Sequence, residues 1–125
     1  LYETTKRISS STEMSSVLRA SIPYMNDDPK VLDAYFACTK LVSSDTEKGR
    51  ILRQLAAKDD IDRYAISGIL HTAQRISSST EAGSVLRSVA PMVKNGDKDL
   101  KDLYMESAKT ISSSSEFRRA IDAIM

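Results

Sequence analysis

Few side chains in this sequence have the types and spacing that catalysis or metal binding requires. His71 is the single histidine, and it stands in "HTAQR" rather than in a His-Glu-x-x-His helix, so its neighbourhood lacks zinc ligands at helical spacing. Cys38 is the single cysteine, which excludes an internal disulfide and a cysteine-based zinc cage. Neither a glycine-rich phosphate loop nor a recognisable Ser-His-Asp set is present. We therefore expect a protein that is not an enzyme, with no catalytic residue, metal or cofactor.

A second candidate for chemistry is a set of acidic and amide residues between the expected helices. The set comprises Asn26, Asp27, Asp28, Asp59, Asp60, Asn95, Asp97 and Asp99. Calcium is one interpretation, but the spacing of an EF-hand loop is not met. Helix capping and the helix dipole also favour such residues at a helix start, and we prefer that interpretation.

The elements that position all of these residues follow from an internal repeat. Serine runs precede Glu13, Glu47, Glu81 and Glu116, which are separated by 34, 34 and 35 residues. "RISSSTEMSSVLR" at Arg7 and "RISSSTEAGSVLR" at Arg75 are nearly the same sequence. Periods of this length are typical of stacked helical repeats.

Each serine run predicts the start of a helix. In a capping box, the serine accepts the backbone N–H three residues on, and the glutamate reaches back to the N–H of the cap. The expected pairs are Ser10 with Glu13, Ser44 with Glu47, Ser78 with Glu81, and Ser113 with Glu116. Apolar residues then recur at helical spacing, and a second helical pattern precedes each serine run, as in "PKVLDAYFACTKLV" with Pro29 at its first position.

The sequence thus predicts an all-α protein in one domain, 1–125. We expect a right-handed α-solenoid of about four antiparallel helix pairs with about 34 residues per repeat, because one helix pair cannot bury both of its apolar faces. The pairs are expected at about 1–25, 29–58, 60–94 and 98–125. Small residues recur at Ser15, Gly49 and Gly83, where neighbouring helices would approach closely. We also expect the chain to be a fragment of a longer protein, because neither end shows a polar capping repeat.

The helices that follow the serine runs carry arginines opposite their apolar stripe. The candidate binding face consists of Arg19, Arg50, Arg53, Arg87 and Arg119. Stacking would align these side chains into a basic surface. The alternative is a ladder in which each arginine pairs with an acid of the neighbouring repeat, and the sequence leaves both open.

The repeat resembles a known type. "VSSDTEKGRIL" from Val42 and "ISSSTEAGSVLRSVAP" from Ile76 are similar to HEAT-like bacterial repeats with an I-S-S-D-x-E-K-x-R-V-L core. Such repeats occur in uncharacterised bacterial proteins and in extracytoplasmic segments of membrane metallopeptidases of the β-lactam-sensor type. The resemblance implies a periplasmic segment of a larger protein; without it, the cytoplasm is the expectation.

Charge and composition limit the partners. Eighteen basic and seventeen acidic residues give a net charge of +1, and no apolar run approaches the roughly 20 residues that span a bilayer. We expect a scaffold that binds protein or peptide, or a structural or sensory segment, with no membrane contact and with self-association through the uncapped ends. The alternative function is nucleic-acid binding on the basic face, which the balanced charge and the lack of an aromatic platform beside the arginines disfavour.

Overall fold

Helices make up most of the structure. The computed structural model describes residues 13–24, 28–58 and 61–125, and of residues 11 and 12 only the backbone. Within these ranges it contains α-helices and one short 3-10 helix but no strand, which confirms the all-α prediction. The elements are α2 (Ser11–Ser21), η1 (Ile22–Tyr24), α3 (Pro29–Leu41), α4 (Asp45–Ala56), α5 (Arg63–Ala73), α6 (Ser79–Lys94), α7 (Lys98–Ala108) and α8 (Ser114–Asp122).

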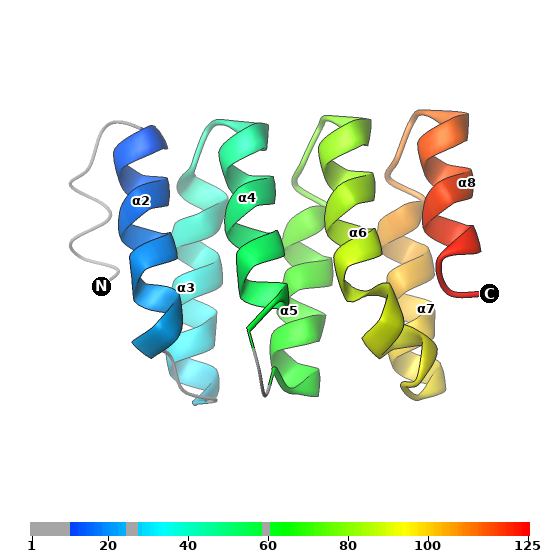
Figure 1. Ribbon diagram of the computed structural model, residues 1–125, viewed down its shortest axis with the longest axis horizontal. Helices are drawn as coiled ribbons and strands as arrows, with labels where there is room; N and C mark the ends of the chain where they lie inside the picture. The colour runs from blue at the N-terminus through cyan, green and yellow to red at the C-terminus, as the bar shows by residue number, and fades with distance from the viewer. Residues whose placement is uncertain (1–10, 25–27, 59–60) are drawn as a thin grey trace.

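The helices lie in two rows (Figure 1). Helices α2, α4, α6 and α8 stand side by side and form the front row, while α3, α5 and α7 form the back row. Each helix of a row contacts the next helix of the same row and also its neighbours in the other row. The front row therefore contains the helices that follow the serine runs, and the back row contains those that precede them.

The front-row helices begin where the serine runs predict. Ser44, Ser78 and Ser113 are the N-caps of α4, α6 and α8, and each side chain accepts the backbone N–H of the glutamate three residues on. These caps satisfy N–H groups that have no partner within the helix. The fourth expected cap, Ser10, lies outside the described residues.

Aspartates cap the back row. Asp28 caps α3 with Pro29 directly after it, as expected, and Asp62 and Asp97 cap α5 and α7. Proline suits this first helical position because its missing N–H would have no partner there in any case.

The expected hydrogen bond from the backbone N–H of the cap to the glutamate three residues on is wrong for α6 and α8. The N–H of Ser78 donates to Asp45 Oδ2 at 2.9 Å, and the N–H of Ser113 donates to Ser79 Oγ at 3.1 Å. Asp45 and Ser79 are the first residues of α4 and α6. The acceptor for each cap therefore comes from the preceding helix of the front row, which leaves the glutamate side chain available for another contact.

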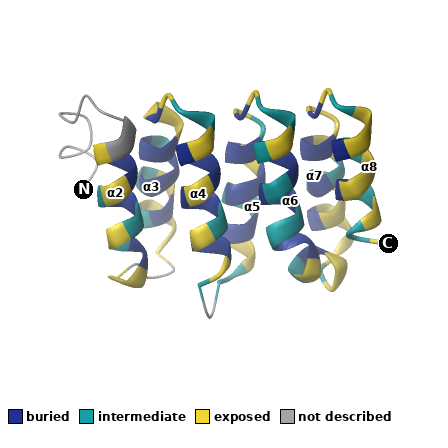
Figure 2. Ribbon diagram, turned by 45° about the horizontal axis from the view of Figure 1, so that its top comes forward, coloured by how far each residue is buried: buried dark blue, intermediate teal, exposed yellow. Residues whose placement is uncertain are grey.

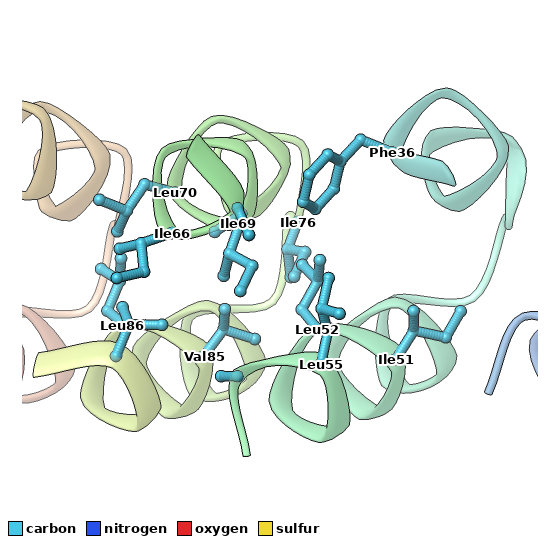
Figure 3. Close-up of a cluster of buried hydrophobic side chains, with 14 of the residues drawn as sticks. Phe36, Ile51, Leu52, Leu55, Ile66, Ile69, Leu70, Ile76, Val85 and Leu86 are labelled. Atoms are coloured by element: carbon cyan, nitrogen blue, oxygen red, sulfur yellow. The ribbon is translucent and has the colours of Figure 1, made fainter. Parts of the chain in front are cut away.

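The apolar core lies between the two rows (Figure 2). Buried residues occupy the facing sides of the helices, and exposed residues occupy their outer sides. Figure 3 shows Leu52 and Leu55 of α4, Ile69 of α5 and Val85 of α6 gathered in this layer. Burial of such a continuous apolar layer is the main favourable term in folding.

Two buried tyrosines connect the rows through hydrogen bonds. Tyr35 Oη donates to the carbonyl of Leu18 at 2.7 Å, and Tyr104 Oη donates to the carbonyl of Ala120 at 2.6 Å. Burial raises the pKa of both hydroxyls above the ordinary tyrosine value, to about 12 for Tyr104. Both tyrosines therefore stay protonated and keep donating throughout the neutral pH range.

The serine caps yield a first prediction. Replacement of Ser78 by alanine removes the acceptor for the Glu81 N–H, so we expect Ser78→Ala to lower the free energy of unfolding by about 1 kcal/mol. Ser77→Ala is the matched control, because Ser77 is exposed and precedes the cap. Chemical denaturation of both variants measures the difference, and equal stability of the two would contradict the role of Ser78.

Candidate interaction surface

All five arginines of the candidate binding face lie on the front row. Arg19 lies on α2, Arg50 and Arg53 on α4, Arg87 on α6, and Arg119 on α8. Arg50 and Arg119 are exposed, whereas the other three are half-buried. This difference separates them into two groups with different contacts.

Arg53 contacts the next helix of the front row. Its Nη1 lies 2.7 Å from Glu81 Oε2 and donates to Ser84 Oγ at 3.3 Å, and both partners are on α6. The side chains of Arg53 and Glu81 keep 32% and 20% of their surface exposed, so the pair is partly shielded from water. It therefore loses less to solvent screening than a fully exposed ion pair does.

A glycine makes room for this carboxylate. Gly49 precedes Arg53 by four residues, which places both on the same face of α4. A Cβ atom at Gly49 would overlap the Glu81 carboxylate. The predicted small-residue position is thus the place where the glutamate of the next helix enters.

The same arrangement recurs between α6 and α8. A Cβ atom at Gly83 would lie 2.6 Å from Glu116 Oε2, and Arg87 Nη2 lies 3.8 Å from the same oxygen. Arg119 Nη1 holds the other oxygen, Oε1, at 3.3 Å. Glu116 Oε2 is buried and accepts no hydrogen bond within the described part of the chain, so this carboxylate is less well satisfied than that of Glu81.

The contact between α2 and α4 is a variant. Ser15 replaces the glycine, and its hydroxyl accepts from Arg19 Nε at 3.2 Å. Glu47 of α4 is bound within its own helix, by Arg50 Nη1 at 3.2 Å. Glu47 therefore has a cation three residues further along, as Glu116 has in Arg119.

These contacts divide the predicted face. Arg53 and Arg87 follow the ladder alternative, because each lies within 4 Å of a glutamate on the neighbouring helix. Arg50 and Arg119 keep 49% and 63% of their side-chain surface exposed, and each pairs with the glutamate three residues earlier in its own helix. The binding role of the face stays a prediction, and the exposed pair is where it would reside.

The other candidate residues lie apart from this surface. His71 is exposed on α5, Cys38 is buried in α3, and Asp28 and Asp97 serve as caps. Asn26, Asp27, Asp59 and Asp60 lie outside the described residues. Among the residues that are described, no cluster of three or more His, Cys, Asp or Glu side chains could hold a metal ion.

Comparison with known proteins gives no relative. No protein-family model matches the chain, and no curated protein or solved structure is significantly similar to it. The resemblance to HEAT-like repeats therefore stays a prediction. In the described ranges, every helix is too short or too polar to cross a membrane.

The glycine position yields a second prediction. We expect Gly83→Leu to destabilise the protein by about 1–3 kcal/mol, because the new side chain would displace the Glu116 carboxylate and overpack the contact between α6 and α8. Thr80→Leu is the control, since Thr80 is exposed on the same helix. Thermal unfolding compares the two, and an unchanged melting temperature for Gly83→Leu would show that the space is not required.

The ion pair between α4 and α6 yields a third prediction. A double-mutant cycle with Arg53→Met and Glu81→Gln should give a coupling free energy of about 1 kcal/mol, the upper end for exposed pairs, because the contact is short and partly shielded. The same cycle at Lys98 and Asp102, which are 87% and 59% exposed, should give a coupling within experimental error. Equal coupling in the two cycles would mean that shielding adds nothing at Arg53.

Proposed function

We propose that this chain is a non-catalytic helical-repeat scaffold that binds a protein or peptide. In this proposal the two rows are the layers of a right-handed, HEAT-like α-solenoid of antiparallel helix pairs. The other form of this proposal is a structural or sensory segment of a larger bacterial protein, extracytoplasmic if the resemblance of the repeats extends to their setting.

One observation carries the proposal: two exposed arginines occupy equivalent positions on a closely joined row of helices. Arg50 and Arg119 each lie three residues after the recurring glutamate of the repeat, Glu47 or Glu116, and each pairs with that glutamate. Two helix spacings of about 8–10 Å each separate the axes of α4 and α8. Each guanidinium has five N–H donors, so donors remain for a partner's carboxylates.

On α6, which lies between α4 and α8, Ser84 occupies the corresponding position and accepts a hydrogen bond from Arg53. At this position the row therefore carries an exposed arginine on α4 and α8 and a serine on α6. This spacing suits an extended acidic segment that contacts both arginines, because two linked contacts bind more tightly than either one alone.

The fourth prediction tests this surface with a defined probe. A fluorescently labelled 12-residue peptide rich in glutamate should bind the protein, and its glutamine counterpart should not. Arg50→Met combined with Arg119→Met should weaken the glutamate peptide by at least about tenfold, the equivalent of 1.4 kcal/mol. Arg75→Met removes one exposed charge outside the row and should leave affinity unchanged.

Two outcomes would overturn the proposal. One is equal binding of the glutamate and glutamine peptides, measured by fluorescence anisotropy. The other is a preference for a single-stranded oligonucleotide of the same length, with retention that falls steeply as salt rises; this result would favour the nucleic-acid alternative. Circular dichroism of each variant verifies that the helices are intact.

A further inference from the structure

The outer side of α8 carries a stripe of side chains that lines an open groove. Helix α8 stands at the end of the front row and contacts α6 and α7 (Figure 1). The groove has a volume of about 370 Å³, and its lining residues are Ser114, Phe117, Arg118, Ile121 and Asp122. Because they are three or four residues apart, these side chains share one side of the helix over about two turns. We call them the α8 stripe.

The corresponding stripe on α6 is a helix-packing face. It consists of Ser79, Ala82, Gly83, Leu86 and Arg87. There Gly83 makes room for Glu116 of α8, and Leu86 is fully buried. On α8 the counterpart of Leu86 is Ile121, which is only partly buried, as is Phe117. The α8 stripe therefore keeps the spacing of a packing face while its apolar side chains are partly uncovered.

Two opposite charges lie beside these apolar side chains. Arg118 and Asp122 are exposed, and neither side chain makes a hydrogen bond or an ion pair within the residues that the structure describes. They are one helical turn apart on one edge of the stripe, whereas Phe117 and Ile121 are one turn apart on the other edge. Each edge thus carries two different groups in a defined order along the helix.

This order makes the stripe complementary to itself. When a second α8 lies antiparallel against the first about a twofold axis, each edge meets the same edge of the other copy in reverse order. Arg118 then meets the partner's Asp122, and Asp122 meets the partner's Arg118. On the other edge, Phe117 meets the partner's Ile121 in the same reciprocal way. A parallel pair about a twofold axis would instead place the charged edge against the apolar edge.

We propose that two copies of this chain associate through an antiparallel pair of α8 helices, with Phe117 and Ile121 in contact across the interface and two ion pairs between Arg118 and Asp122. The apolar side chains supply the driving force, and the ion pairs select the antiparallel register. This contact goes beyond the proposed scaffold function and does not rest on it.

The size of the contact sets its strength. Helix α8 has nine residues, and only one side of it would be covered. The interface is therefore smaller than the roughly 800 Å² per partner that stable complexes bury. We accordingly expect a weak dimer that dissociates on dilution.

The fifth prediction is a reversible dimer whose stability depends on Arg118. Sedimentation equilibrium of the full chain from about 10 μM to about 1 mM, the range of weak association, should show a mass that rises from monomer to dimer and no further. Arg118→Asp should weaken the dimer by at least about tenfold, because both ion pairs become pairs of like charge. Lys101→Asp makes the same change of charge at an exposed position of α7 and should leave the dimer unchanged.

A charge swap tests the antiparallel register directly. Asp122→Arg alone should also weaken the dimer, but an equimolar mixture of the Arg118→Asp and Asp122→Arg chains should associate, because each chain then meets the opposite charge at both positions. The double variant, with both substitutions in one chain, should dimerise about as tightly as the original. Circular dichroism verifies that the helices of every variant are intact.

The proposal is wrong if the chain stays monomeric up to about 1 mM, if Arg118→Asp and Lys101→Asp weaken the dimer equally, or if mixing the two single variants restores no association. It is also wrong if the mass grows beyond that of a dimer, since a head-to-tail contact between different faces forms open chains rather than a closed pair. The assay contains no peptide, so its result is independent of glutamate binding at Arg50 and Arg119.

Discussion

The glutamates that α6 and α8 insert into the preceding front-row helix are the contacts on which the order of these helices depends. Glu81 enters the space that Gly49 leaves on α4 and meets Arg53, and Glu116 enters the space beside Gly83 on α6. A hydrogen bond from the next helix's cap to Asp45 or Ser79 accompanies each insertion. The glutamate lies on the later helix of each pair, whereas the glycine and the arginine lie on the earlier one. The contact therefore has a direction, and it forms only when the helices stack in sequence order.

This contact explains why the sequence repeats so strictly in one row and so loosely in the other. Helix α6 carries the cap, the glutamate, the small residue and the arginine at once, because its glutamate packs on α4 and it accepts the glutamate of α8. Back-row helices are joined by contacts that differ from one pair to the next, such as Tyr64 with Asp33 between α5 and α3, and Arg63 with the cap Asp97 of α7. Gly68 and Leu103 occupy the same place in adjacent repeats.

The sequence was sufficient for the starts of the helices, which depend on residues close along the chain. Caps at Ser44 and Ser78 follow from local hydrogen bonding, and their prediction was correct. The partner of the Ser78 N–H was not predictable in this way, because Asp45 is 33 residues away and competes with the local glutamate. For the same reason periodicity aligned the arginines but could not separate Arg53, paired across helices, from Arg50. The contact of Phe36 with Gly68 was not predictable either, because it joins two helices and has no local signal in the sequence.

Helix α8 lacks the glycine and the arginine that contact the glutamate of the next helix on α4 and α6. Arg118 stands where α4 and α6 have glycine, and Asp122 stands where they have Arg53 and Arg87. A glutamate that approached α8 as Glu116 approaches α6 would meet a bulky side chain in place of a space, and a carboxylate in place of a guanidinium. Both changes oppose the same mode of docking, one by steric overlap and the other by like-charge repulsion. Phe117 and Ile121 are nevertheless only partly buried on α8, so an apolar contact there remains available to a helix that docks differently. Self-association through this face therefore requires a geometry other than the one that orders the front row.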